Sequence, residues 1–203
     1  MSNRILVWDV PTRVFHWLMV LSFAGAFLTA ESERNRDVHV ALGYILLGLL
    51  AFRLLWGFLG TNYAKFASFM FGPGEVLSYL KSLVNREPVH YVGHNPAGSV
   101  AIWMLLILGV ASSVSGVLVY EDIGGDELVE LHDLVSYAML FVVVGHILGV
   151  LVGSLMHREN LVRAMITGFK SDGQNEGIEQ SYLWLGVTIL IVVVAFGFGY
   201  TLV

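Results

Sequence analysis

The sequence predicts an all-α integral membrane protein, and two observations lead to this fold class. Of the 203 residues, 56% are hydrophobic and only 13% are charged, a composition typical of chains that lie in a lipid bilayer. Five apolar runs are each long enough to cross about 30 Å of hydrocarbon as a helix, which satisfies its own backbone hydrogen bonds there. The five runs cover residues 12–30, 38–58, 97–119, 129–156 and 183–202.

Two shorter segments have helical patterning without the length of a span. Within residues 75–84 the apolar residues recur at helical spacing, and Pro88 is expected to end the helix. A similar stretch covers residues 161–166. We expect both to lie on the cytoplasmic membrane surface. Residues 1–170 would then form a four-helix core with these interfacial segments, and residues 171–203 a linker and a fifth transmembrane helix.

The distribution of basic residues predicts the orientation. Nine of the eleven lysines and arginines fall on the side of the N-terminus, and only Arg34 and Arg36 fall on the other side. Short cytoplasmic loops carry an excess of Lys and Arg, so the N-terminus is predicted to be cytoplasmic. With five spans, the C-terminus lies outside.

Four histidines lie at matched depths in the predicted spans. His132 and His146 are 14 residues apart on one helix, which corresponds to a rise of roughly 21 Å with about 40° between their azimuths. His16 and His39 lie near opposite ends of the hairpin formed by the first two spans. Depth therefore pairs His16 with His146 on the N-terminal side and His39 with His132 on the far side.

A histidine inside a membrane is costly unless a partner satisfies it. Any one of the four could be a hydrogen-bonded packing residue, but their agreement in depth and azimuth predicts two haems stacked across the bilayer. His16 and His146 would ligate the inner haem iron, and His39 and His132 the outer one. The chain has no cysteine, which excludes thioether-linked haem, iron–sulfur clusters and disulfides, so both haems would be non-covalent haem b.

Two arginines are further candidates for cofactor binding. Arg53 follows His39 by 14 residues and should share its face at the depth of His16. A haem propionate or a quinone oxygen would satisfy it there, and snorkelling to the interface is the alternative. Arg13, one turn below His16, has the same two interpretations. The histidines outside the spans are expected at the surface, where they could relay protons to a quinone site: His90, His94 and His157.

An acidic loop separates the third and fourth runs. It contains five carboxylates and no basic residue: Glu121, Asp122, Asp126, Glu127 and Glu130. A solvated cap is one explanation. The other is a docking patch for a positively charged redox partner, because such a field accelerates association.

Several motifs resemble one family, the bacterial cytochrome b561 and nickel–iron hydrogenase cytochrome b-subunit family. They are Val7-Trp8-Asp9-Val10-Pro11-Thr12-Arg13-Val14-Phe15-His16-Trp17, Gly93-His94-Asn95-Pro96, Glu130-Leu131-His132 and His157-Arg158-Glu159-Asn160. The likeness covers residues 5–170. It implies a four-helix core in the bacterial inner membrane, with two b haems held by His16, His39, His132 and His146. It also implies electron transfer between the quinone pool and a partner protein.

The leading hypothesis is therefore a di-haem b-type cytochrome that exchanges electrons between quinone or quinol and an external redox protein. We expect an electron-transfer component without catalytic residues of its own. Its expected partners are membrane lipid, quinone and a periplasmic redox protein, with a c-type cytochrome as the first choice and a hydrogenase as the second. We expect no binding of nucleic acid. A superoxide:quinone oxidoreductase is the alternative, although the acidic loop opposes an anionic substrate. A membrane anchor that uses haem only for stability is the third possibility.

Overall fold

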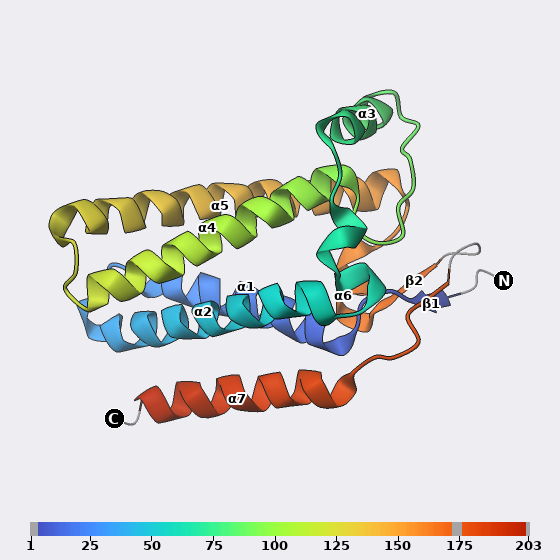
Figure 1. Ribbon diagram of the computed structural model, residues 1–203. Coiled ribbons are helices and arrows are strands. Elements are labelled where there is room, and N and C mark those ends of the chain that lie inside the picture. The colour runs from blue at the N-terminus through green and yellow to red at the C-terminus, as the bar shows by residue number, and fades with distance from the viewer. Residues whose placement is uncertain (1–3, 172–175, 202–203) are drawn as a thin grey trace.

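The computed structural model describes residues 4–171 and 176–201, and it confirms the all-α membrane fold (Figure 1). Within these residues, five helices are long and apolar enough to cross a membrane. They are α1 (Val10–Thr29), α2 (Arg36–Leu59), α4 (Pro96–Tyr120), α5 (Gly125–Met156) and α7 (Leu183–Thr201).

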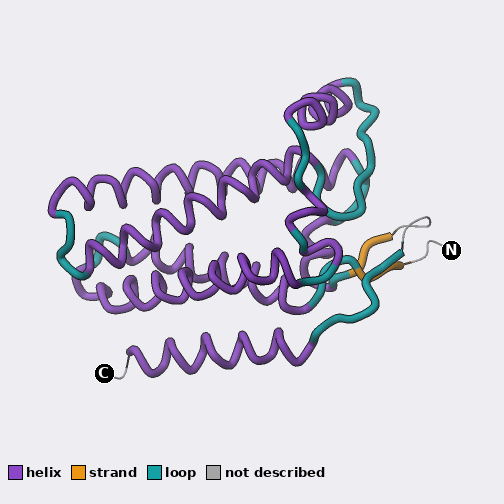
Figure 2. The backbone as a smooth tube through the Cα atoms, viewed as in Figure 1, coloured by secondary structure: helices purple, strands orange, loops and turns teal. Residues whose placement is uncertain are grey.

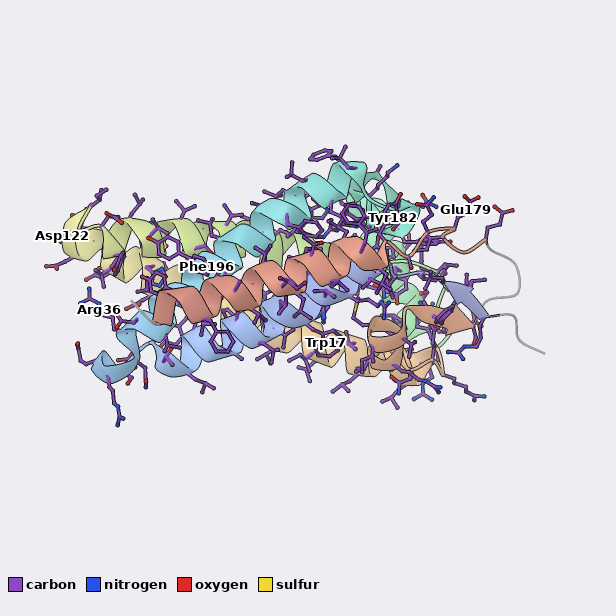
Figure 3. The ribbon with its side chains drawn as sticks, turned by 90° about the horizontal axis from the view of Figure 1, so that it is seen from below. Trp17, Arg36, Asp122, Glu179, Tyr182 and Phe196 are labelled. Carbon is purple, nitrogen blue, oxygen red and sulfur yellow. The ribbon has the colours of Figure 1, made fainter. Side chains whose placement is uncertain are left out.

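The helices pack as two pairs with α7 outside them. α1 lies along α2, α4 lies along α5, and contacts between α2 and α4 join the pairs. α7 packs against α1 and α2, as the separate lower helix of Figure 2 shows. Charged side chains gather at the two ends of the bundle, with Arg36 and Asp122 at one end and Glu179 at the other, and mainly apolar side chains between them (Figure 3).

The helix α5 begins at Gly125, whereas the apolar run predicted a start at residue 129. Gly124 precedes it with a φ of 92°, a left-handed conformation that glycine adopts readily. Asp126 and Glu127 then occupy the first turn, where negative side chains interact favourably with the helix dipole. The helix thus extends beyond its apolar part.

Both short segments predicted to be helical are helices at the N-terminal end of the bundle. They are α3 (Pro73–Val84) and α6 (Leu161–Thr167). α3 ends at Val84, before Pro88, and Arg86 follows with a φ of 60°. Two short 3-10 turns, Asn62–Ala64 and Phe66–Phe69, connect α2 to α3.

A small antiparallel sheet, which the periodicity did not predict, closes the same end. β1 (Arg4–Leu6) pairs with β2 (Phe169–Ser171), so that Ile5 lies opposite Lys170. The backbone N–H groups of Val7 and Trp8 then donate to the carbonyl of Gly168, at 2.8 and 3.1 Å. Strands of three residues are too short to give a period-two signal.

Asp9 joins three parts of this end. Its side chain is fully buried and caps α1 by accepting from the Thr12 N–H at 2.7 Å. The other carboxylate oxygen accepts from Trp56 Nε1 at 3.0 Å and from Thr61 Oγ1 at 2.6 Å. The first motif of the family resemblance, around Trp8 and Asp9, therefore begins α1 and fastens it to the end of α2.

We predict that Asp9→Ala destabilises the protein strongly. The change removes the helix cap and leaves buried donors of Trp56 and Thr61 without an acceptor, so the free energy of unfolding should fall by about 2–4 kcal/mol. Denaturation in detergent, followed by circular dichroism, measures the loss. Asp37→Ala, an exposed first-turn aspartate of α2, is the matched control and should cost less than about 1 kcal/mol. Equal losses would contradict this role of Asp9.

Candidate functional site

The structure brings the predicted outer pair of histidines together. The rings of His39 on α2 and His132 on α5 have centroids 6.3 Å apart and planes at 84°. A metal–imidazole bond is about 2 Å long, so two rings on opposite sides of one ion have centroids roughly 6 Å apart. The spacing of His39 and His132 fits this geometry.

Hydrogen bonds fix the tautomers of both rings. His39 Nδ1 lies 2.8 Å from the carbonyl oxygen of Ala26, and His132 Nδ1 lies 3.0 Å from that of Ser112. A carbonyl can only accept, so each Nδ1 carries the hydrogen. Each Nε2 then presents a lone pair, the arrangement by which proteins orient metal-ligating histidines.

Gly116 on α4 gives His132 the room that it needs. A Cβ added at this glycine would lie 2.9 Å from Cε1 of the His132 ring, closer than such atoms approach one another. Ser115, the preceding residue, places its Oγ 3.0 Å from His132 Nδ1. The helix α4 carries no predicted ligand, but it positions the ring of His132 on α5.

The inner pair lies at the opposite end of the bundle. His16 on α1 and His146 on α5 are within electrostatic range of each other, although no direct ring contact joins them among the described residues. The His16 Nδ1 is enclosed and has no hydrogen-bond partner in the part of the chain that the structure describes. Gly149, one turn beyond His146, has open space beside it, since an added Cβ would meet nothing within 4 Å.

Arg53 is buried and does not extend to the interface. Its side chain is 4% exposed, and its guanidinium carbon lies 4.9 Å from the ring centroid of Phe66 and 5.7 Å from that of Phe69. These cation–π contacts leave Nη1 enclosed without a hydrogen-bond partner among the described residues. A carboxylate or carbonyl oxygen of a bound cofactor would fit this donor.

Arg13 anchors α6. Its Nη1 donates to the carbonyl oxygen of Ile166 at 2.6 Å, while its Nε is enclosed and unpaired within the described ranges. Trp17, one turn along α1, donates more weakly to the Met165 carbonyl at 3.4 Å. One side of α1 is thus held against the segment that follows α5.

The expectation that His94 lies at the surface is wrong. Its ring packs 4.7 Å from Trp8 and 4.6 Å from Phe69, and its enclosed Nδ1 has no partner in residues 4–171 and 176–201. Burial lowers the pKa of His94 to about 3, and the nearby positive charges of Arg53 and Lys170, with weaker contributions from His146 and His16, act in the same direction. His94 is therefore a neutral residue near the inner pair.

The other two histidines outside the spans differ from each other. His90 is exposed, as expected, whereas His157 is partly buried and its Nε2 lies 3.2 Å from the Tyr79 hydroxyl.

The sequence did contain a signal for the position of His94, in the two residues that follow it. Asn95 caps α4 by accepting from the Gly98 N–H at 2.7 Å, and Pro96 begins the helix, so His94 is held at a helix start.

Three unpaired polar atoms thus converge on the inner end: His16 Nδ1, Arg53 Nη1 and His94 Nδ1. Buried polar atoms without a partner are costly, and proteins rarely keep them without a ligand or water. At the outer end each histidine Nδ1 has a carbonyl partner, whereas no hydrogen bond joins either Nε2 to another of the described residues. This donor set fits two bis-histidine haem sites, with additional donors at the inner one.

Three proteins with curated names are similar to this chain over much of its length. The chain is 25% identical to a protein of Azotobacter vinelandii named probable Ni/Fe-hydrogenase B-type cytochrome subunit, over 83% of this chain and 89% of that protein. A protein of Azotobacter chroococcum with the same name is 28% identical over 60% and 61% of the two chains. The probable Ni/Fe-hydrogenase 1 B-type cytochrome subunit of Escherichia coli K12 is 21% identical over 81% and 90%. No solved structure matches significantly.

The family described as prokaryotic cytochrome b561 matches residues 7–168. This range begins just after β1 and ends just before β2, so it includes all four predicted ligands and both pairs of packed helices. α7 lies outside it. The chain therefore belongs to the prokaryotic cytochrome b561 family and is a membrane b-type cytochrome with a role in electron transport.

Proposed function

We propose that this cytochrome passes electrons between quinone or quinol in the membrane and a redox partner through two b haems. The single observation that carries the proposal is the outer pair, where His39 and His132 lie 6.3 Å apart with both Nδ1 atoms tethered. Simple packing would not require two facing imidazoles with free Nε2 atoms. His16 and His146 would form the inner pair at the depth of Arg53.

The haems would supply the one-electron redox chemistry, and the side chains of this chain would hold and tune them. The carbonyls of Ala26 and Ser112 would accept the Nδ1 hydrogens of His39 and His132 and so fix the direction of each Nε2. Two histidines per iron leave no open coordination position, which favours electron transfer over oxygen binding.

The inner end is the proposed quinone side. Arg53 Nη1 and His94 Nδ1 are enclosed donors or acceptors that would bind a haem propionate or a quinone oxygen. Their positions next to Phe66, Phe69 and Trp8 exclude bulk water, which strengthens polar interactions with a ligand. Arg13, held by the Ile166 carbonyl, would contribute its charge to the same region.

The named relatives change the order of the proposed partners. Each is called a Ni/Fe-hydrogenase subunit, so a hydrogenase takes the first place that the sequence alone gave to a c-type cytochrome. The superoxide:quinone alternative has no support in these comparisons. The proposed orientation places the N-terminus in the cytoplasm and the C-terminus in the periplasm, with the exposed carboxylates of residues 121–130 facing the partner.

We predict that His39→Ala and His132→Ala each remove the outer haem and spare the inner one. Either change leaves one imidazole opposite an empty ligand position, so haem b per chain should fall by half in a pyridine haemochrome assay. Quinol should still reduce the remaining haem, while transfer to an external acceptor stops. His90→Ala, at an exposed histidine, is the control and should keep both haems. Equal loss of both haems in a folded His39→Ala protein would contradict the assignment.

Gly116→Ala tests how α4 positions the outer ligand. The new Cβ would displace the His132 ring, so we predict a lower occupancy or a shifted midpoint potential of the outer haem alone. Redox titration of the visible spectrum measures both. Gly48→Ala on α2 is the matched control, because an added Cβ there meets nothing within 4 Å. Unchanged potential and occupancy in Gly116→Ala would show that this contact does not position the ligand.

A further inference from the structure

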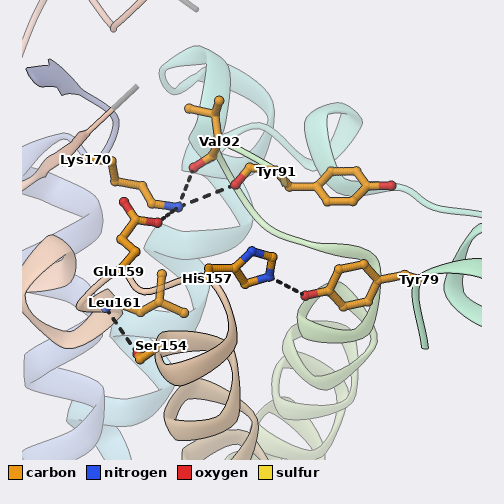
Figure 4. Close-up of polar contacts among 8 residues, drawn as sticks. All are labelled: Tyr79, Tyr91, Val92, Ser154, His157, Glu159, Leu161 and Lys170. Atoms are coloured by element: carbon orange, nitrogen blue, oxygen red, sulfur yellow. Dashed lines mark hydrogen bonds and ion pairs between the residues drawn. The ribbon is translucent and has the colours of Figure 1, made fainter. Parts of the chain in front are cut away.

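A polar cavity lies where α5 ends, outside the haem and quinone regions. It has a volume of about 410 Å³ and is bounded by the turn after α5, by α6 and by the β1–β2 sheet. Figure 4 shows part of its lining, with His157, Glu159 and Lys170 close together. None of these residues has a role in the proposed electron transfer.

The charge of the lining is strongly positive. Four permanent cations contribute to it, Arg4, Arg158, Arg163 and Lys170, against the single carboxylate of Glu159. That carboxylate is already paired, since its Oε2 lies 3.0 Å from Lys170 Nζ, which is the only ion pair among the described residues. The three arginines are therefore left without an acidic partner in the described chain.

The buried lysine makes this arrangement rigid. Lys170 is 6% exposed and also donates to the carbonyl oxygens of Val92 at 3.0 Å and Tyr91 at 3.5 Å (Figure 4). Burial and the charges of His90 and Lys170 lower the pKa of His157, despite the opposing effect of Glu159. The cavity thus carries a preformed positive potential that favours an anion.

Exposed apolar side chains neighbour the cavity residues in the sequence, at the end of α5 and in α6. Leu155, Val162 and Ile166 have exposed fractions of 78%, 43% and 57%. Leu155 belongs to the last turn of α5, two residues before the cavity residue His157. Exposed apolar side chains next to a cluster of arginines match the two ends of a phospholipid at the level where a transmembrane helix leaves the hydrocarbon.

We propose that this cavity binds the phosphate of an anionic phospholipid headgroup in the leaflet on the N-terminal side. Arg158 and Arg163 contact the phosphate oxygens, and Arg4 closes the cavity from β1. The acyl chains run along Leu155 and the exposed apolar face of α6. A free phosphate ion shares the headgroup chemistry, but it gains nothing from the exposed apolar side chains of α5 and α6. The proposal depends on the membrane fold and is independent of the electron-transfer function.

The test uses the full-length cytochrome in nanodiscs of phosphatidylcholine with increasing phosphatidylglycerol. Native mass spectrometry counts phosphatidylglycerol molecules that stay bound after release into detergent. Arg158→Gln with Arg163→Gln should lower the apparent affinity on the order of tenfold, since each basic residue near the surface contributes appreciably. Lys65→Gln with Lys81→Gln removes the same charge from exposed positions outside the cavity and should bind as the wild type does.

The outcomes separate the alternatives. Retention of phosphatidylglycerol by the double arginine variant, or equal loss in the lysine control, would overturn the proposal. Displacement of the lipid by inorganic phosphate would assign the cavity to a soluble anion and overturn the lipid assignment. Circular dichroism and haem content, which should remain unchanged in all variants, show that any loss of lipid comes from the cavity and not from unfolding.

Discussion

A side-chain nitrogen atom that is buried in the apolar bundle needs a hydrogen-bond partner or a metal ion. This requirement determines how the residues of the candidate site are arranged. Transfer of a polar group from water into hydrocarbon without a hydrogen bond costs a free energy on the order of 2–7 kcal/mol. His39 and His132 meet the requirement at Nδ1 through carbonyls of neighbouring helices. The enclosed atoms His16 Nδ1, Arg53 Nη1 and His94 Nδ1 have no such partner among the described residues, and a bound cofactor would supply one.

The continuous helix α5 fixes how far apart the two proposed ligand pairs are. His132 and His146 belong to one uninterrupted helix, Gly125–Met156, so their separation follows from helix geometry at roughly 21 Å. The helix is held along its length by α4, with Gly116 and Ser115 next to His132. The N-terminal end is closed differently, by Asp9, the small sheet and the aromatic rings around Arg53 and His94. Packing at both ends thus holds the two proposed ligand pairs at fixed depths.

The sequence predicted the local features of the fold well and the tertiary ones poorly. Long apolar runs located the spans, because hydrophobicity over about 20 residues is a strong signal. The start of α5 was missed since Asp126 and Glu127 lie outside the apolar run. The burial of Arg53 and His94 depends on Phe66 and Phe69, which reach them from a 3-10 turn that no periodicity indicates. The pairing of His39 with His132 was predicted, because depth along helices can be counted from the sequence.

The most direct test of the central claim is the haem content of the unmodified protein. Pyridine haemochrome analysis of detergent-purified protein gives haem b per chain, and the dithionite-reduced minus oxidised spectrum gives the spin state. Two low-spin b haems per chain are the predicted result, because the four histidines would form two bis-imidazole sites. One haem per chain would contradict one of the two pairings, and a chain without haem would contradict the electron-transfer account as a whole.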